Sequence, residues 1–323
     1  MRIVMINDCA YVGETLTEYF PEEVQTTHLR RSRGLLDKTY RTVLRIRKAE
    51  GDLYHCHYLL QDCWLALKFH KRPILGHAHG TDVRESIKHP VWGRMIKHNL
   101  KKCNKIIVST PNLLERAIEF NENSEYIPNP VNRKIFHPET KPHTTEPIAT
   151  KWRVLIASAC DWRVRGTDKI IRALKMIREP IKVKLIEAGG DYFKTIALAN
   201  SLDLKLDLLP PVPHSEMPKY YWDADIIVAS IGIGGTLGMT ALEAIACGKP
   251  VITNVSSTYP VYDTFPIHDV STSEQIAETI LSSRDGRLWQ AENDYLESFH
   301  NPEVITGRFV RIYDDLIGEK SDD

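Results

Sequence analysis

The sequence predicts an α/β protein with two doubly wound domains, and three observations carry this prediction. Short apolar strands alternate with helical patterns along the whole chain. Runs rich in valine and isoleucine, such as KIIVS and DIIVAS, are typical of parallel strands that are buried on both faces. A stretch rich in proline and threonine, PETKPHTTEPIATK, interrupts the pattern near the middle of the chain and is typical of a linker.

The strands follow one another in order, with helices expected between them. In the first half we expect strands at residues 2–6, 52–57, 73–77, 105–109 and 125–127. In the second half we expect strands at residues 153–157, 182–187, 206–209, 226–229 and 251–254. The last segment carries Ile305, Phe309, Ile312 and Leu316 at helical spacing, which predicts a terminal helix.

These elements predict a first domain at residues 1–137, a linker at 138–151, a second domain at 152–300 and a helix at 301–323. The terminal helix is long enough to cross back to the first domain. Doubly wound sheets bind ligands beyond the carboxyl ends of their strands, so we expect the ligand in a cleft that the two domains face.

The composition is that of a soluble globular protein. The 323 residues are 42% hydrophobic and 26% charged. No apolar run reaches the ~18 residues of a membrane-spanning helix, and the start MRIVMINDCAYVGE lacks the layout of a secretory signal, so a cytoplasmic protein is expected. The six cysteines form no C-x-x-C pair and are expected to be reduced thiols.

Charge is distributed unevenly although the net charge is zero. Residues 1–150 carry 23 Lys and Arg against 17 Asp and Glu, and the remainder carries 19 against 25. This asymmetry predicts an anionic partner for the first half without identifying it.

The most informative stretch is GGTLGMTALEAIACGKPVI, residues 234–252. It predicts a glycine-rich loop, a helix at 239–246 and a C-cap at Gly248. Glycines and the first amides of a helix can hold a phosphate. Glu243 lies about one turn into the helix, where a carboxylate can accept two hydrogen bonds from a ribose. A nucleotide site is therefore predicted, with the alternative that Glu243 merely favours the helix dipole.

This stretch resembles the donor-binding motif of the family 4 retaining glycosyltransferases, which have the GT-B fold. That motif reads E-G-F-G-x-x-x-x-E-A-x-A-C-G-x-P-V, and residues 235–251 align with it as GTLGMTALEAIACGKPV, with Gly235 at its first position. Four further segments resemble family motifs in the family's order: GHAHGTDV, KIIVSTPNLLERA, EYIPNPVNRKIFHPE and RVRGTDKIIRALKMI. The resemblance covers nearly the whole chain and implies a GT-B fold of two Rossmann-like domains.

The resemblance implies roles for residues of the second domain. Glu243 would bind the nucleotide ribose. The amides of Gly238, Met239 and Thr240 would hold the diphosphate. Arg165, which precedes Gly166, would neutralise it as a catalytic cation.

Two positions depart from the family pattern. Gly235 occupies the donor-binding position at which the family has its first glutamate. The family's G-R pair is replaced around Ala159 and Cys160, and Arg163 is the nearest substitute. These departures leave the identity of the donor sugar undetermined, and a reduced or absent activity stays an alternative.

The first domain supplies three further candidates through the same resemblance. The family's histidine before glycine lies near the donor sugar, which makes His79 a candidate catalytic residue, while its neighbour His77 is expected in the core. The loop after the first strand is expected on the acceptor side, with Gly13 as its remaining glycine and Tyr11 available to stack on an acceptor.

No metal and no cofactor are predicted. His55 and His57 with Cys63 are the nearest approach to a metal-binding set, but they lack the spacing of a zinc site. The resemblance implies that fixed cations and amides stabilise the leaving diphosphate instead.

The segment LRRSRGLLDKTYRTVLRIRK, residues 29–48, is strongly basic. Arg30–Lys48 could form an amphipathic helix on an anionic membrane, with Leu36, Tyr40, Val43 and Leu44 on its apolar face. The alternative is a solvated face of a Rossmann-domain helix. No nucleic-acid-binding motif is found.

The resemblance implies a retaining glycosyltransferase, and specifically a hexosyltransferase. It would move a sugar from a UDP- or GDP-linked donor to a sugar or lipid-linked acceptor, in the cytoplasm or peripherally at the inner membrane face. Two alternatives stay open, namely a non-catalytic nucleotide-sugar-binding subunit and a UDP-sugar 2-epimerase of the same fold.

Overall fold

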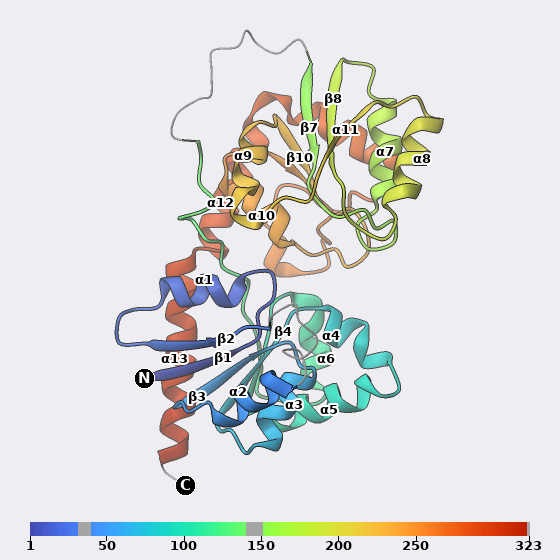
Figure 1. Cartoon of the computed structure of the whole chain (residues 1–323). Coiled ribbons are helices and arrows are strands. Elements are labelled where there is room, and N and C mark those ends of the chain that lie inside the picture. Colours follow the sequence, from blue (N-terminus) through green and yellow to red (C-terminus); the bar gives the residue numbers. More distant parts are fainter. Residues whose placement is uncertain (32–39, 140–150, 322–323) are drawn as a thin grey trace. The chain divides into compact units, whose positions relative to one another are not determined.

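The computed structural model describes residues 1–31, 40–139 and 151–321. The chain divides into two compact units, and Figure 1 labels their helices and strands. The first unit consists of Met1–Pro130 and His300–Asp323, and the second consists of Val131–Phe299. Both units are parallel α/β folds, as the alternation of strands and helices predicts.

The first unit is built on a parallel sheet with the strand order β2-β1-β3-β4-β5-β6. Its strands are β1 (Arg2–Ile6), β2 (Gln25–Leu29), β3 (Leu53–His57), β4 (Ile74–Ala78), β5 (Lys105–Val108) and β6 (Ser124–Tyr126). Its helices are α1 (Val12–Tyr19), α2 (Thr42–Lys48), α3 (Gln61–Lys68), α4 (Thr81–Arg84), α5 (Trp92–Lys102), α6 (Leu114–Ile118) and α13 (Pro302–Ser321).

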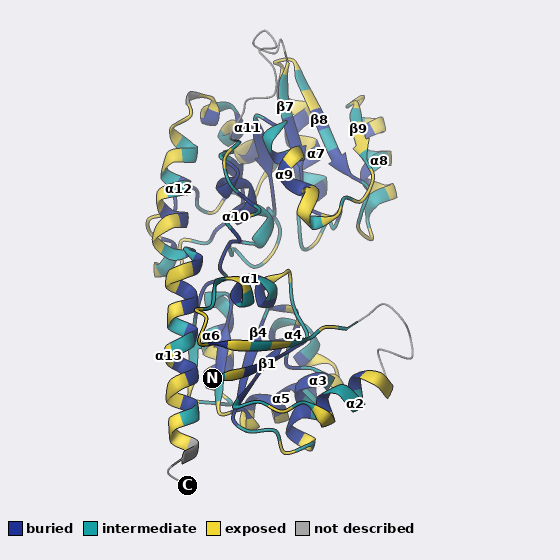
Figure 2. Ribbon diagram, turned by 60° about the vertical axis from the view of Figure 1, so that its left-hand side comes forward, coloured by how far each residue is buried: buried dark blue, intermediate teal, exposed yellow. Residues whose placement is uncertain are grey.

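Helices cover both faces of this sheet, and strand alternation decides which side chain meets which helix. Helices α2, α3 and α5 pack side by side in one layer. The terminal helix α13 packs against α1 and β3 (Figure 2). Along β3, the Cys56 side chain belongs to the same apolar cluster as Cys63 of α3, whereas His55 contacts Tyr313 of α13.

The second unit is built on a parallel sheet with the order β11-β10-β7-β8-β9. Its strands are β7 (Trp152–Ile156), β8 (Ile181–Ile186), β9 (Leu206–Leu209), β10 (Ile226–Val228) and β11 (Val251–Ile252). Its helices are α7 (Thr167–Met176), α8 (Tyr192–Ser201), α9 (Met217–Trp222), α10 (Met239–Ala246), α11 (Ser273–Ser282) and α12 (Arg287–Phe299).

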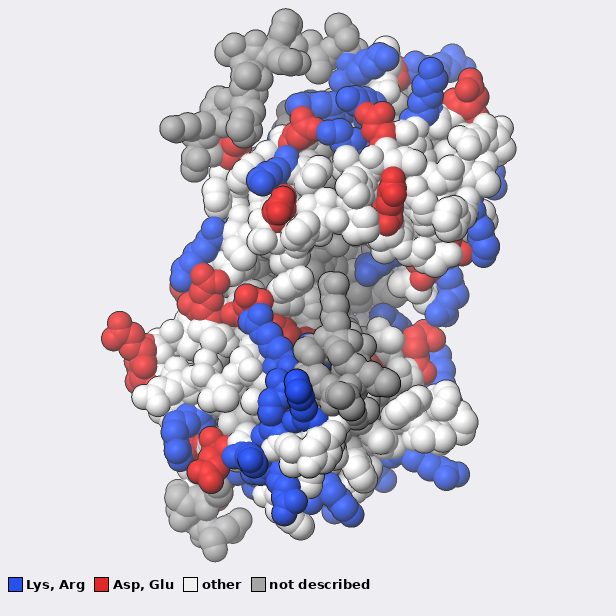
Figure 3. All heavy atoms as spheres, in the orientation of Figure 1, with Lys and Arg blue, Asp and Glu red and all other residues white. Residues whose placement is uncertain are grey.

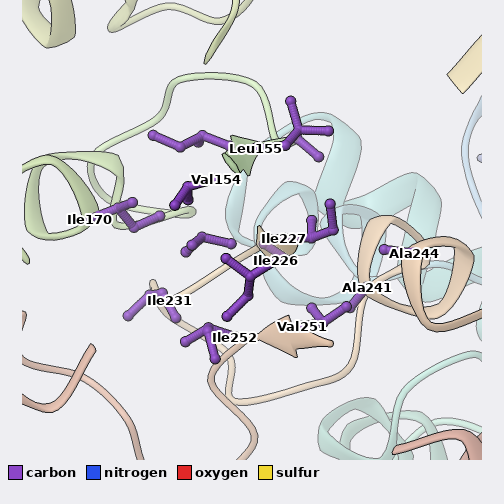
Figure 4. Packing of buried hydrophobic residues seen from close by; sticks show 14 of the residues in the cluster. Val154, Leu155, Ile170, Ile226, Ile227, Ile231, Ala241, Ala244, Val251 and Ile252 are labelled. Atoms are coloured by element: carbon purple, nitrogen blue, oxygen red, sulfur yellow. The ribbon is translucent and has the colours of Figure 1, made fainter. Parts of the chain in front are cut away.

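The core of the second unit fixes the strand that carries the glycine-rich loop. Ile226 and Ile227 of β10 are fully buried, and Figure 4 shows them between Val154 of β7, Val251 of β11 and Ala241 of α10. Burying each of these isoleucines contributes roughly 1.5–3 kcal/mol, so β10 is a firm base for the loop that follows it.

The strand β2 was missing from the predicted strands. Its sequence QTTHL has no apolar pattern, and the structure places it at the edge of the sheet. Tyr40 and Arg41 form π-helical backbone that leads directly into α2, and Tyr40 is 68% exposed, so docking of this segment on a membrane stays a prediction. The buried residues of α2 are Thr42 and Ile46. The predicted Leu36 lies outside the described residues.

The boundaries of the units differ from those expected. The first unit ends at Pro130, because Val131 and Phe136 are buried in the core of the second unit. The terminal segment belongs to the first unit from His300 onward, which agrees with the expected crossing of the terminal helix back to the first domain. Most of the expected linker, residues 140–150, lies outside the described residues. Within the described residues, no helix has the length and apolar character that crossing a bilayer requires.

Candidate active site

The second unit places a glycine-rich loop between β10 and α10, at the carboxyl end of its sheet. The loop ends at Gly238, the N-cap residue of α10, which offers no capping side chain. The first amides of a helix have no acceptor inside that helix, so the amides of Met239 and Thr240 are left for a ligand. Together with the helix dipole they favour an anion at this position.

A second loop, between β7 and α7, lies directly against the glycine-rich loop. Ile231 N donates a hydrogen bond to the Arg165 carbonyl oxygen at 2.9 Å, and Ser230 Oγ donates to the Val164 carbonyl oxygen at 3.2 Å. Gly232 permits this approach, because a Cβ there would lie 2.2 Å from that Val164 oxygen. The two loops therefore form one continuous surface.

This pairing of loops brings Arg165 to the start of α10. A Cβ at Gly238 would lie 3.9 Å from Arg165 Nη1, so guanidinium and helix start are neighbours. Arg163 lies on the same loop and is exposed. Gly166 follows in the left-handed conformation, with φ 66, and is the N-cap residue of α7. The planar, permanently charged guanidinium of Arg165 thus lies beside the first amides of α10, an arrangement suited to binding a diphosphate.

Glu243 is buried, with 5% of its surface exposed, and both of its oxygens have protein partners. Oε1 lies 2.7 Å from His214 Nε2, and Tyr221 Oη donates to Oε2 at 3.3 Å. Burial and the neighbouring Glu243 charge raise the pKa of Tyr221, which keeps its hydroxyl proton available for this bond. A carboxylate has about four acceptor positions, so Glu243 retains capacity for a ribose.

The sequence analysis did not identify His214. It lies in the short 3-10 helix His214–Glu216 before α9, 29 residues before its partner Glu243 in the sequence. Its ring also packs against Phe136, with the ring centroids 5.0 Å apart. No spacing signal connects these residues, since the fold alone brings them together.

The backbone at Gly235 explains why this chain lacks the family's first glutamate. Gly235 has φ 52, and a Cβ there would lie 2.7 Å from Ser256 Cβ. The Gly235 carbonyl also accepts a hydrogen bond from Ser256 N at 2.9 Å. A side chain here is disfavoured twice, by the left-handed backbone and by contact with Ser256. Gly235 can therefore serve a donor only through its backbone.

In the first unit, Asp82 organises the loop that carries His79. The buried Asp82 carboxylate accepts hydrogen bonds from four backbone amides, those of Leu59, His79, Gly80 and Val83, at 3.0–3.2 Å. This holds the carboxyl end of β4 in one conformation. Burial nevertheless leaves the pKa of Asp82 above its usual value, since desolvation outweighs the four hydrogen bonds.

His79 itself is half-buried and paired with another histidine. His79 Nε2 lies 3.0 Å from His57 Nδ1, and the two rings are stacked. Desolvation, and next the nearby His57, lower the pKa of His79 well below its ordinary value. The imidazole of His79 is therefore neutral at neutral pH, and it suits hydrogen bonding to a sugar better than proton donation.

The loop after β1 is held by Asp8, which the sequence analysis did not single out. Asp8 Oδ1 accepts hydrogen bonds from Cys9 N at 2.7 Å and from Gly13 N at 2.8 Å. A Cβ at Gly13 would lie 3.0 Å from His57 Nε2, so Gly13 is needed for packing. Tyr11 is 46% exposed with φ 62, a strained conformation for a tyrosine. Its place on the acceptor side stays a prediction.

The buried histidines of β3 and β4 form a core cluster. Ring nitrogens of His55, His57 and His77 lie within 4.8 Å of one another, close enough to be considered as metal ligands. However, the rings of His55 and His57 are stacked, with centroids 4.4 Å apart, so their in-plane lone pairs do not converge on one point. Both nitrogens of His55 are also engaged, one by Tyr313 Oη and one by His77.

The cysteine considered with these histidines lies on the other face of the sheet. Cys63 Sγ is 3.6 Å from Cys103 Sγ, in the cluster that contains Cys56. The set of His55, His57 and Cys63 is therefore not brought together. A metal-independent reaction stays a prediction.

The predicted residues thus fall into two groups, one in each unit. In the second unit Arg165, Gly238 and Glu243 surround the start of α10. In the first unit His57 links His79 to Gly13 at the carboxyl ends of the strands.

Comparison with known proteins matches both halves of the chain. Residues 14–134 match the family described as Glycosyltransferase Family 4, and residues 141–263 match the family described as Glycosyl transferases group 1. Together these matches include the loop of His79 and the glycine-rich loop, whereas Gly13 lies just before the first matched residue.

Curated relatives are more distant. D-inositol 3-phosphate glycosyltransferase of Arthrobacter sp. (strain FB24) is 26% identical over 166 residues, which are 46% of this chain and 39% of that protein. UDP-N-acetylglucosamine--N-acetylmuramyl-(pentapeptide) pyrophosphoryl-undecaprenol N-acetylglucosamine transferase of Caldicellulosiruptor saccharolyticus is 28% identical over 193 residues, 56% of this chain and 49% of that protein. The chain therefore spans half or less of the length of these relatives.

Among solved structures, HepE of Anabaena in complex with UDP-glucose superposes with a TM-score of 0.75. The superposition covers 98% of this chain and 100% of that chain at 13% identity, which shows a shared fold. With both halves matched by glycosyltransferase families and both units folded as parallel α/β domains, the chain belongs to the glycosyltransferases of the GT-B fold.

Proposed function

We propose that this protein is a retaining glycosyltransferase that moves a sugar from a nucleotide-diphosphate sugar to an acceptor hydroxyl. The observation that carries the proposal is the pairing of Arg165 with the uncapped start of α10, where a Cβ at Gly238 would lie 3.9 Å from Arg165 Nη1. A diphosphate needs such a combination of fixed cation and backbone amides.

The donor is held by the second unit. The amides of Met239 and Thr240 bind the diphosphate, and Glu243 accepts hydrogen bonds from the ribose while His214 and Tyr221 hold its carboxylate. The complex of HepE with UDP-glucose supports a UDP-linked donor, and a GDP-linked donor is the second choice.

The reaction needs no metal in this proposal. Negative charge builds on the diphosphate as the bond to the sugar breaks. Arg165, the helix-start amides and the exposed Arg163 stabilise that charge, and preorganised groups of this kind are typically the largest contribution to catalysis. The acceptor proton passes to the departing phosphate, so no side-chain base is invoked.

The first unit serves the acceptor and the sugar. Neutral His79, held by His57, hydrogen-bonds the transferred sugar, and the loop of Tyr11 and Gly13 contacts the acceptor. The names of two relatives include an inositol phosphate and a pyrophosphoryl-undecaprenol. These names support a polar or lipid-linked acceptor.

Peripheral membrane attachment through the basic segment is part of the proposal. A groove of about 450 Å³ lies between β2 and α2, with Leu29 and Leu44 among its lining and the cations Arg41, Arg45 and Lys48 around it. Figure 3 shows Lys and Arg side chains gathered over this part of the first unit. Arg31 is less suited to a membrane than expected, because it forms a bidentate pair with Asp62 at 2.6 Å.

A panel of UDP- and GDP-sugars tests the donor site by thermal shift, since a ligand of the folded state raises the unfolding temperature. Arg165→Gln should weaken binding of the selected donor about ten- to a hundredfold, the usual cost of losing a charge-assisted hydrogen bond. Arg178→Gln, an exposed change in the same unit, is the control and should leave binding unchanged. Equal binding by wild type and Arg165→Gln would refute the proposed diphosphate site.

A non-catalytic nucleotide-sugar-binding subunit is the second candidate, and Gly235 is the observation that favours it. The left-handed backbone and the contact with Ser256 leave no side chain at this position to bind donor hydroxyls. Sugar release from the selected donor, followed by NMR, separates the two functions. Transfer or hydrolysis with retained anomeric configuration supports the enzyme, and tight binding without turnover supports the subunit.

A further inference from the structure

A second cationic hollow lies in the first unit between α3 and α5, away from the loops of His79 and Tyr11. Its volume is about 400 Å³. The residues that line it are Trp64, Leu67, Lys68, His70, Arg72, His98 and Lys102. Arginine, lysine and histidine supply most of this lining, and no aspartate or glutamate is among the residues that line it.

The hollow lies near the amino ends of the strands, whereas the candidate acceptor site lies at their carboxyl ends. Arg72 precedes β4, which begins at Ile74, whereas His79 follows the end of β4 at Ala78. The five residues of β4 separate the two positions by roughly 16 Å at the usual rise of a strand. A ligand in this hollow therefore has no access to His79 within the same unit.

Helix dipoles do not account for all of this charge. Lys68 and Lys102 lie in the last turns of α3 and α5, where a cation favours the negative end of the helix. Arg72 lies outside both helices and His98 lies inside α5, so the same explanation does not apply to them. Basic side chains converge on this one hollow from three separate segments.

The surroundings of the hollow indicate an amphiphilic anion. Leu67 and the Trp64 indole provide apolar surface within it, and Lys68 Nζ stands 6.0 Å from the Trp64 ring centroid. Outside the hollow, α5 adds Arg94, Lys97 and Lys101, and its eleven residues include no carboxylate. A small soluble anion needs neither the apolar wall nor this extended charge, whereas a charged lipid surface uses both.

We propose that the hollow between α3 and α5 binds the phosphate of an anionic phospholipid and so docks the first unit on a membrane. The phosphate accepts hydrogen bonds from Lys68, Arg72 and Lys102, and the Trp64 indole lies against the glycerol and upper acyl region of the lipid. This inference rests on the proposed membrane attachment and extends it from α2 across the α2, α3 and α5 layer to a defined lipid site.

Co-sedimentation of the full chain with phosphatidylcholine vesicles, with and without phosphatidylglycerol, tests the site. Lys68→Gln combined with Lys102→Gln should weaken binding to the anionic vesicles at least tenfold, because each basic residue near such a surface contributes about a fivefold factor. The matched control is Lys97→Gln combined with Lys101→Gln, which removes the same charge from α5 outside the hollow. The control should lose clearly less binding.

Three results would overturn the inference. Wild-type protein that does not bind anionic vesicles would refute it. Equal losses of vesicle binding in the two double variants would also refute it, because they indicate that only diffuse charge acts. Saturable binding of inorganic phosphate to a chain that ignores vesicles would assign the hollow to a soluble anion. Donor-induced thermal shifts are recorded for the same samples. If these shifts persist while vesicle binding fails, only the membrane site is lost, and the reverse pattern removes only the donor site.

Discussion

Gly235 shows how a single backbone position limits what the donor site can contain. The resemblance to family 4 aligns this glycine with a glutamate, and the sequence offers no reason for the exchange. The structure supplies one, since φ is 52 and Ser256 Cβ lies 2.7 Å from where a Cβ would stand. Recognition of the donor sugar must therefore come from other groups.

Gly235→Ala should lower the free energy of unfolding by more than a left-handed backbone alone explains. The conformational cost is about 1–2 kcal/mol, and the contact with Ser256 should add about 1–3 kcal/mol. The matched control is Gly286→Ala, where φ is 76 and no atom lies within 4 Å of an added Cβ. Denaturant unfolding of both variants gives the comparison. Equal losses would mean that the contact with Ser256 is not limiting.

Residues that belong to one sequence motif were predicted better than residues that only the fold brings together. Spacing alone placed Glu243 about one turn into α10, and the structure agrees. His214 and Asp8 escaped prediction for a common reason. Each acts through a hydrogen bond to a residue or amide that the fold brings to it, and neither belongs to a recognised motif.

The histidines of β3 and β4 form a buried layer that packs against α13. His55 Nδ1 lies 2.7 Å from Tyr313 Oη, and His55 Nε2 lies 3.1 Å from His77 Nδ1. Desolvation, together with the other histidines, lowers the pKa values of His55, His77 and His79, and desolvation lowers the pKa of His57 to about 4. The layer is therefore packed in its neutral form.

Stability of the first unit should fall as the pH drops from about 6.5 to about 4. In this window the unfolded histidines bind protons and the folded ones resist them, so protonation favours unfolding. His57 alone, with a pKa of about 4, accounts for roughly 3 kcal/mol across the window. The measurement is the free energy of unfolding at a series of pH values.

His57→Asn should make this decline shallower, because it removes one of the titrating groups. The matched control is His70→Asn, which removes an exposed histidine of the same unit and leaves the buried histidine layer intact. A slope that is identical in wild type and His57→Asn would contradict the role assigned to the histidine layer.

Periodicity predicted most strands because their side chains are buried on both faces, as in β4 and β10. It failed for β2, whose residues Gln25–Leu29 lie at the sheet edge and have no apolar pattern.

For the whole molecule, chain order and structural unit do not coincide. The terminal helix α13 belongs to the first unit, where Phe309 and Tyr313 are buried. Residues 131–137 belong to the second unit, although their motif closes the first half of the sequence. A sequence can mark a proline-rich linker, but only burial decides which core takes the residues on either side of it.

The two units also divide the proposed chemistry. The second carries the anion-binding helix start with Arg165, and the first carries the neutral histidine pair and the basic helical layer. This division follows the charge asymmetry in the sequence, where residues 1–150 are the more basic part. Family resemblance and charge predicted this broad plan, and the folded structure added the groups that hold each site in place.

Hydrogen–deuterium exchange with and without the donor selected from the UDP- and GDP-sugars tests whether the diphosphate binds at the start of α10. The amides of residues 238–243 and of the loop at residues 161–166 should exchange more slowly in the presence of donor, because the diphosphate rests on the start of α10 beside Arg165. Donor binding that leaves these two segments unprotected, or protects only segments elsewhere in the chain, would show that the diphosphate does not bind at the start of α10.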